Sequence, residues 1–148
     1  MRSLLLSSIL IAGAFLMLSC GTGQPRIDYG KAECAHCRMT VVDQRFAAAL
    51  ITKAGRQYVF DGMECMVPFV AEGTVTDGQV ALWYVCDHAH PGVMLDATSC
   101  FYLHGPAFRS PMRGDVAAFA TEADRDAAMH RDGGAVLDWA GVRKLLAP

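Results

Sequence analysis

The stretch FAAALITKAGRQYVFDGMECMVPFVAE, residues 46–72, carries the pattern from which we expect the fold to follow. Its first two runs, Phe46–Thr52 and Arg56–Phe60, are rich in strand-forming residues, and the Ala-Gly pair between them predicts a hairpin. The third run, Met63–Glu72, has the pattern of a short helix, and Asp61 is well suited to cap its start. A proline inside this run is unfavourable for a helix. The stretch therefore predicts two strands followed by a helix.

The C-terminal part of the sequence repeats this order. Val59–Phe69 can be laid on Val136–Leu146 without a gap, at an offset of 77 residues. A unit of about 50 residues buries little core by itself, so two such units are expected to pack together. We therefore predict an α+β fold of two small related ββα-type units, at about residues 31–78 and 79–148. Other expected elements are strands at Val80–Val85, Ser99–Leu103, Val116–Phe119 and Ala135–Leu137, and helices at Glu122–Arg131, capped by Thr121, and at Trp139–Leu146.

The apolar N-terminus and the charge balance limit the class of protein. Hydrophobic residues make up 53% of the 148 residues, which is too apolar for intrinsic disorder. Leu4–Leu18 carries no charge and follows Arg2, as in a secretory signal peptide, here residues 1–19. This run is shorter than the roughly 20 residues that span a bilayer. Beyond residue 20 the chain has 12 basic and 15 acidic residues, a balance that disfavours nucleic-acid binding.

The end of the leader contains a candidate lipidation site. Leu16-Met17-Leu18-Ser19-Cys20-Gly21 resembles a bacterial lipobox, in which Cys20 is lipidated and becomes the mature N-terminus. Residues 20–30 would then form a lipid anchor and flexible tether, and residues 31–148 the folded domain. An ordinary cleaved signal, with Cys20 incidental, is the alternative. In both cases the protein is expected to be extracytoplasmic. With lipid, it is anchored to a bacterial membrane and faces the periplasm.

Sulfur is the unusual part of the composition, with six Cys and eight Met in a small chain. If Cys20 carries lipid, five cysteines remain, so at least one thiol lies outside any intramolecular disulfide. Cys34, Cys37 and Met39 place three soft donors within six residues, which favours Cu(I) over hard cations. The thioether argues against a zinc site. The alternatives are a thioredoxin-type redox pair and a structural disulfide.

Further sulfur donors follow in the sequence. Cys65 and Met66 lie at the start of the predicted helix, where methionine at helical spacing more often packs in a core than binds a cofactor. Met112 lies in a Pro-Met-Arg-Gly turn, at the place in the second unit that corresponds to Met39 in the first. One interpretation of this correspondence is a site shared between the units. A surface or packing role is the other.

Cys86 and Cys100 flank a loop that contains His88 and His90. A disulfide between the two cysteines would tie neighbouring strands together in an oxidising compartment. The alternative is an accessory metal site formed by Cys86, His88 and His90. The sequence leaves both interpretations open.

Taken in order, the motifs resemble those of the NosL family. They are a lipoprotein leader, a C-x-x-C-x-M motif, a hairpin running into Phe-Asp-x-x-x-Cys-Met, a Trp-x-x-x-Asp segment, a Pro-Met turn and a closing Gly-Gly…Trp. In this chain they stand at Cys34–Met39, Phe60–Met66, Trp83–Asp87, Pro111-Met112, and Gly133-Gly134 with Trp139. Each motif alone is weak, but their order and spacing together are specific. Family members do not usually carry cysteines at the positions of Cys86 and Cys100.

NosL proteins are accessory lipoproteins of nitrous oxide reductase maturation. The resemblance implies that this chain binds Cu(I) and hands it on for assembly of the copper–sulfide centre of the reductase. It implies as partners a maturation complex with an ABC-type transporter and a periplasmic solenoid protein. It also implies a monomer whose fold is akin to that of the organomercurial lyase MerB. The implied copper donors are Cys34, Cys37, Met39 and Met112, followed by Cys65 and Met66, with His36 as a further candidate inside the first motif.

The sequence contains no carboxylate pair, Ser-His-Asp set, phosphate loop or nucleotide fingerprint, so a non-enzymatic role is expected. Three other functions remain open. A thiol–disulfide oxidoreductase would use Cys34 and Cys37. MerB-like organometal chemistry would use Cys37, Cys65 and Asp61. A structural lipoprotein would bind no metal.

Overall fold

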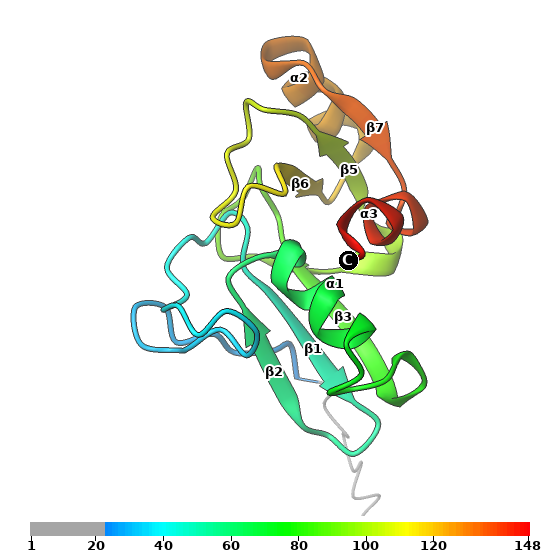
Figure 1. Cartoon of the computed structure of the whole chain (residues 1–148). Helices are drawn as coiled ribbons and strands as arrows, with labels where there is room; N and C mark the ends of the chain where they lie inside the picture. The colour runs from blue at the N-terminus through cyan, green and yellow to red at the C-terminus, as the bar shows by residue number, and fades with distance from the viewer. Residues whose placement is uncertain (1–22) are drawn as a thin grey trace, which may run out of the picture.

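The computed structural model describes residues 23–148, which form two antiparallel sheets and three helices (Figure 1). The larger sheet has the strand order β2-β1-β3-β4 and the smaller one β6-β5-β7, so the predicted α+β class is confirmed. The predicted leader, residues 1–19, and the lipidation site Cys20 lie outside the described residues. The strands are β1 (Ala48–Thr52), β2 (Gln57–Phe60), β3 (Val80–Cys86), β4 (Met94–Asp96), β5 (Phe101–His104), β6 (Val116–Phe119) and β7 (Ala135–Leu137), and the helices are α1 (Met63–Ala71), α2 (Glu122–Asp132) and α3 (Trp139–Leu146).

The hairpin and helix predicted from residues 46–72 form in the structure. β1 pairs with β2 in antiparallel register, with Ala48 opposite Phe60, and pairs on its other side with β3. The prediction that Asp61 caps α1 is wrong, because Gly62 is the N-cap residue and no side chain bonds to the helix start. Asp61 is instead only 2% exposed. Its carboxyl group is therefore buried beside the first turn of α1.

β4 is a strand that the sequence pattern did not predict. It has three residues, and its pairing with β3 places Met94 opposite Cys86. The strand expected from Ser99 begins at Phe101, because Ala97–Ser99 form a 3₁₀ turn. β3 and β4 both belong to the larger sheet although they follow residue 79, so the two sheets do not coincide with the two predicted halves. The boundary between the halves stays a prediction.

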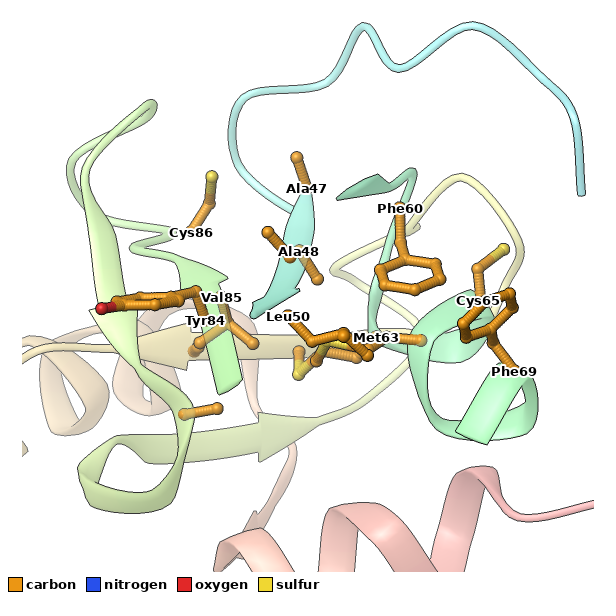
Figure 2. Close-up of a cluster of buried hydrophobic side chains, with 14 of the residues drawn as sticks. Ala47, Ala48, Leu50, Phe60, Met63, Cys65, Phe69, Tyr84, Val85 and Cys86 are labelled. Carbon is orange, nitrogen blue, oxygen red and sulfur yellow. The ribbon is translucent and has the colours of Figure 1, made fainter. Parts of the chain in front are cut away.

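The main core lies between the larger sheet and α1 and extends to Tyr102 and Val116 of the smaller sheet and Val142 of α3. Figure 2 shows Leu50 of β1 and Phe60 of β2 close to Met63 at the start of α1. Met66 and Cys65, from the same helical turn, are also fully buried members of this core. The buried face of α1 therefore carries sulfur as well as hydrocarbon.

α3 joins the two sheets. The ring centroid of Trp139, its first residue, lies 5.6 Å from that of Trp83 in β3 and 6.0 Å from that of Tyr102 in β5. Trp83 and Tyr102 belong to different sheets, so a single side chain packs against both. Within residues 23–148, no helix combines the length and the apolar character needed to cross a bilayer.

Candidate metal centre

Three thiols from two separate segments meet beside the start of α1. The sulfur atoms of Cys34, Cys37 and Cys65 all lie within 4.8 Å of one another. Cys34 and Cys65 are fully buried and Cys37 is half-buried, so Cys37 is the member nearest to solvent. Within residues 23–148, no other set of three histidine, cysteine or acidic side chains converges in this way. We call these three residues the thiol cluster.

A tight hairpin carries the first two thiols. The backbone N–H of Cys34 donates to the carbonyl of Met39 at 2.8 Å, and that of Arg38 donates to the carbonyl of Cys34 at 3.1 Å. Arg38 has a φ of 67°, a left-handed conformation that reverses the chain within a few residues. The N–H of Ala35 donates to the carbonyl of Val59 at 2.9 Å. This bond fixes the hairpin against β2.

Cys65 enters the cluster from the first turn of α1. Its backbone N–H donates to the carbonyl of Gly62 at 3.1 Å. Only Asp61 and Gly62 separate β2 from α1, so this first turn stays close to the strand against which the thiol hairpin is fixed. The convergence depends on how that hairpin docks on β2, which sequence spacing does not reveal.

The distances between the sulfur atoms suit a single soft cation. Metal–thiolate bonds of about 2.3 Å place three sulfur atoms about 4 Å apart around one ion, and the cluster spans no more than 4.8 Å. A ligand set made of thiols favours Cu(I), which is a soft ion. Structural zinc takes four protein ligands, and no fourth histidine, cysteine or carboxylate joins the group in the described part of the chain.

The three thiols of the cluster differ in how readily they ionise. A hydrogen bond from the Cys65 thiol holds the pKa of Cys34 well below its usual range, and backbone N–H groups, including that of Cys37, lower this pKa further. The same hydrogen bond, together with burial, raises the pKa of Cys65, and burial raises the pKa of Cys37. Cys34 thus ionises more readily than the other two thiols. A cation must displace the protons of these two thiols before three thiolates bind it.

Two acidic side chains near the start of α1 have oxygen atoms without a hydrogen-bond partner among residues 23–148. They are Asp61 Oδ1 and Glu64 Oε2. Burial raises the pKa of Asp61, and the nearby Cys34 thiolate raises it further. A cation bound nearby would lower this pKa and favour the ionised carboxylate. The sequence patterns did not single out Glu64, although its position next to Cys65 was an available signal.

The two candidate thioethers, Met39 and Met112, lie at the surface with exposed fractions of 51% and 42%. Met39 belongs to the hairpin that carries Cys37, two residues further along the chain. The backbone N–H of Met112 donates to Glu64 Oε1 at 3.1 Å, which holds its loop against the first turn of α1. Both methionines therefore lie on segments in contact with those that carry the thiols. As copper donors they stay predictions.

Met66 and His36, the remaining candidate donors, have other surroundings. Met66 leaves the helix about 100° away from Cys65 and is fully buried in the core. His36 Nε2 lies 3.2 Å from Glu72 Oε1, just beyond the end of α1, and its Nδ1 is buried without a partner among residues 23–148. The imidazole does not belong to the converging group. As copper donors Met66 and His36 also stay predictions.

The disulfide between Cys86 and Cys100, one of the two interpretations that the sequence left open, is not formed in the structure, where both residues are free thiols. Cys86 Sγ lies 3.3 Å from Met94 Sδ, and the thiol of Cys100 donates to the carbonyl of Asp96 at 3.1 Å. Each thiol therefore faces a partner of its own. The thiols of the C-x-x-C motif are free as well, so the structure contains no disulfide within that motif.

The accessory site of Cys86, His88 and His90, the other interpretation that the sequence left open, does not assemble either. The ring of His88 lies among three phenylalanine rings, with centroid distances of 5.1, 5.4 and 5.7 Å. His90 Nδ1 lies 2.9 Å from Asp87 Oδ2 at the surface. Both imidazoles are thus engaged away from Cys86, whose neighbour is a methionine.

Known proteins resemble the chain in sequence pattern and in fold. The sequence model of the NosL family matches residues 28–146. No curated protein matches the chain at a significant level. The crystal structure of the copper chaperone NosL from Shewanella denitrificans is similar in fold, with a TM-score of 0.68. The two proteins are 19% identical, and the match covers 79% of this chain and 93% of that chain. At this level of identity the likeness shows the fold alone.

Proposed function

The chain belongs to the NosL family, and from this premise we propose that it is an extracytoplasmic Cu(I)-binding lipoprotein. Its role is to pass copper on for assembly of the copper–sulfide centre of nitrous oxide reductase. The observation that carries the proposal is the thiol cluster, whose three sulfur atoms lie within 4.8 Å of one another. Cu(I) is the cargo of this site, and holding or releasing it requires no catalytic group.

The graded burial of the sulfur donors supports a stepwise transfer of the ion. Met39 and Met112 are exposed, Cys37 is half-buried, and Cys34 and Cys65 are fully buried. Thioethers bind without losing a proton, so an incoming ion meets them first and exchanges them for thiolates afterwards. Release reverses this order, because a ligand from the acceptor replaces an exposed donor before the buried thiolates dissociate. The exposed side of the site is therefore where ligands exchange.

The acceptor in this proposal is the membrane-bound maturation machinery of the reductase, an ABC-type transporter complex with a periplasmic solenoid protein. A lipid on Cys20 would hold the chain at a bacterial membrane, facing the periplasm, beside that machinery. The chain acts there as a monomer, which leaves Met39 and Met112 free to meet the acceptor.

A Cu(I) competition titration against bathocuproine disulfonate tests this proposal. Cys37→Ser is the sharpest variant, because Cys37 is half-buried and serine is similar in size and polarity. We expect the tightest copper-binding step to weaken by about ten-fold or more, with an unchanged circular dichroism spectrum. Met129→Leu in α2 is the matched control and is expected to bind like the wild type. Equal affinities of Cys37→Ser and the wild type would exclude the thiol cluster as the copper site.

A thiol–disulfide oxidoreductase is the second candidate, because a lowered pKa such as that of Cys34 is also typical of redox cysteines. The full burial of Cys34 speaks against it, since attack on a substrate disulfide needs an accessible thiolate. An insulin-reduction assay separates the two functions. The oxidoreductase predicts activity that Cys37→Ser abolishes, whereas the copper chaperone predicts none in either protein.

A further inference from the structure

Two further sulfur atoms lie close together outside the thiol cluster. Cys86 Sγ and Met94 Sδ are 3.3 Å apart, and the hydroxyl of Tyr29 lies 3.2 Å from the same thiol. Cys86 is 1% exposed and Met94 is 6% exposed, so the pair is shielded from water. β1 lies between the strand that carries Cys86 and β2, and Figure 2 shows Ala48 of β1 between Cys86 and Cys65. The two groups of sulfur atoms are therefore separate.

The register of the larger sheet builds this contact. Cys86 is the last residue of β3 and lies directly opposite Met94, the first residue of β4. Directly opposed residues in an antiparallel pair place their side chains on the same face of the sheet. The two sulfur atoms are thus brought together by strand pairing, which gives the pair a fixed position in the fold.

We propose that Cys86 and Met94 form a second, buried Cu(I) site, in which Tyr29 donates a hydrogen bond to the Cys86 thiolate. Thiolates and thioethers are the soft ligands that Cu(I) prefers. One thiolate neutralises the single charge of Cu(I), so the complex has no net charge to bury. A divalent ion would leave an uncompensated positive charge in a dry site, which is costly. The second site uses no residue of the thiol cluster and goes beyond the proposed function.

Copper binding at this pair is a ligand exchange without electron transfer. The S–H bond of Cys86 breaks and its proton goes to solvent, the thiolate binds Cu(I), and Met94 Sδ donates a lone pair. Two bonds of about 2.3 Å in a linear arrangement place the sulfur atoms about 4.6 Å apart. The pair must therefore open from its present 3.3 Å. The methionine side chain is unbranched and flexible enough to supply this movement.

The N-terminal segment of the described chain covers the pair. Tyr29 contacts Cys86, and Gln24 Nε2 donates to the carbonyl of Met94 at 3.4 Å. Across the sheet, the same segment is joined to β2 through two hydrogen bonds between Arg26 and Gln57. Opening of residues 24–29 would uncover the side of the pair that Tyr29 and Gln24 contact and leave the pairing of β3 with β4 intact. Ions can therefore reach the second site without unfolding of the sheet.

Copper stoichiometry tests the second site. All proteins are the full chain with Cys20→Ser and Cys100→Ser, so that neither of these thiols adds a donor. We expect this background to retain two equivalents of Cu(I) against bathocuproine disulfonate, and we expect Met94→Leu to retain one. Leucine and methionine have similar volumes, so the core keeps its packing. Met129→Leu is the matched control and is expected to retain two.

Two further variants separate the second site from the thiol cluster. Tyr29→Phe removes only the hydrogen bond to the Cys86 thiolate. We expect it to lower the affinity for the copper ion that requires Met94 by about ten-fold. Cys37→Ser is expected to weaken copper binding at the thiol cluster and to leave the copper ion that requires Met94 bound. A copper stoichiometry that Met94→Leu leaves unchanged overturns the second site and makes the sulfur pair a packing contact. A Cys37→Ser result equal to the background contradicts the proposed function instead.

Discussion

The hydrogen bond between Cys65 and Cys34 is the largest single influence on the pKa values of these two residues. Because Cys65 donates to Cys34, the two residues are shifted in opposite directions, with the pKa of Cys34 lowered and that of Cys65 raised. Cys34 is therefore the thiol of the cluster that ionises first as the pH rises. A cation displaces its proton most easily, whereas the protons of Cys37 and Cys65 are held more tightly.

His88 links the stability of the fold to pH. Its ring packs against Phe46, Phe108 and Phe119, and burial lowers its pKa below the usual value of 6.5. As the pH falls through about 6.5, the unfolded chain binds a proton on this residue more readily than the folded chain does, which lowers the free energy of unfolding. We expect His88→Phe to remove this loss, which is under about 1 kcal/mol for a partly exposed group.

Urea unfolding at about pH 7.5 and about pH 5.5 measures this effect of His88. The quantity to compare is the change in unfolding free energy between the two conditions, which should be smaller for His88→Phe than for the wild type. Hydrogen bonding to Asp87 raises the pKa of the exposed His90, an effect of opposite sign that is common to both proteins. Identical changes in the two proteins would show that His88 does not titrate differently on folding.

The candidate metal centre shows which of its residues can be predicted from a sequence pattern. Cys34 and Cys37 are local neighbours, and their spacing alone predicted a shared site. Cys65 was placed behind Met39 and Met112 among the candidate donors, because its approach to the motif depends on contacts between distant parts of the chain. The register that brings Met94 to Cys86 is also a long-range property. Residues joined by local chain geometry can be predicted, whereas residues joined by docking or strand pairing require the fold.

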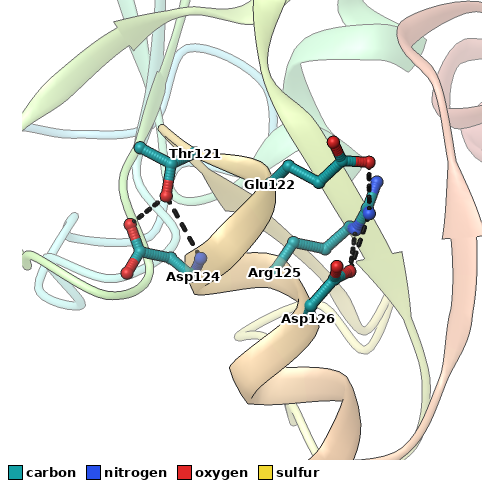
Figure 3. Close-up of polar contacts among 5 residues, drawn as sticks. All are labelled: Thr121, Glu122, Asp124, Arg125 and Asp126. Carbon is teal, nitrogen blue, oxygen red and sulfur yellow. Dashed lines mark hydrogen bonds and ion pairs between the residues drawn. The ribbon is translucent and has the colours of Figure 1, made fainter.

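Among the secondary-structure elements, α2 is the one whose start the sequence specified most completely. Figure 3 shows the Thr121 hydroxyl oxygen bound to the backbone N–H of Asp124, at 3.1 Å, as predicted for a cap. Arg125 pairs with Glu122 and Asp126 along the next turn, at 2.7 Å each. Two acidic residues of this helix, Glu122 and Asp126, are thus paired with the same arginine.

Removal of the Thr121 cap should destabilise the protein. We expect Thr121→Ala to lower the free energy of unfolding by about 1 kcal/mol, because it leaves the Asp124 N–H without its acceptor. Thr121→Ser keeps the hydroxyl oxygen and is expected to stay close to the wild type. Urea denaturation followed by circular dichroism measures both variants. A serine variant as unstable as the alanine variant would assign the loss to the threonine methyl group.

The contact between α1 and the Met112 loop predicts a second effect on copper binding. Glu64 Oε1 accepts the backbone N–H of Met112, so Glu64→Ala frees this loop from the helix. We expect the variant to bind Cu(I) about ten-fold more weakly if Met112 is a donor. Glu64→Gln keeps an oxygen acceptor and should restore most of the affinity in the same competition titration. A glutamine variant as weak as the alanine variant would assign the effect to the lost negative charge.

The elements with strong local signals were predicted to within a few residues. The hairpin of β1 and β2, helix α1 and the capped helix α2 each combine an apolar pattern with a turn or a cap. β4 lacked such a signal, because a strand of three residues has no measurable periodicity and forms only through pairing with β3. The prediction that Asp61 caps α1 was wrong because it, too, ignored contacts between distant parts of the chain. Asp61 has a capping side chain, but its burial beside the thiol cluster takes precedence over that role.

On the scale of the whole molecule, the two sheets share the main core, which includes Tyr102 and Val116 of the smaller sheet beside residues of the larger one. Phe46, Leu103 and Phe119 belong to a smaller core beside the main one. Trp139 lies against Trp83 of one sheet and Tyr102 of the other, and we infer that this contact makes the two sheets unfold together. The sequence predicted two packed units, but it did not predict which side chains join them, because aromatic residues far apart in the chain show no pattern.

Replacement of Trp139 tests this inference about cooperativity. We expect Trp139→Ala to lower the free energy of unfolding by about 3 kcal/mol, near the lower end for tryptophan because the ring is half-buried. Trp139→Phe keeps an aromatic ring between Trp83 and Tyr102, so the free energy of unfolding should fall by less in this variant.

Circular dichroism reports on all helices and strands, while the fluorescence of the remaining Trp83 reports on the larger sheet. In the wild type the two signals should change together along a urea titration, as a single cooperative unit requires. In Trp139→Ala they should separate, with the larger sheet unfolding last. Coincident transitions in that variant would show that other contacts couple the two sheets.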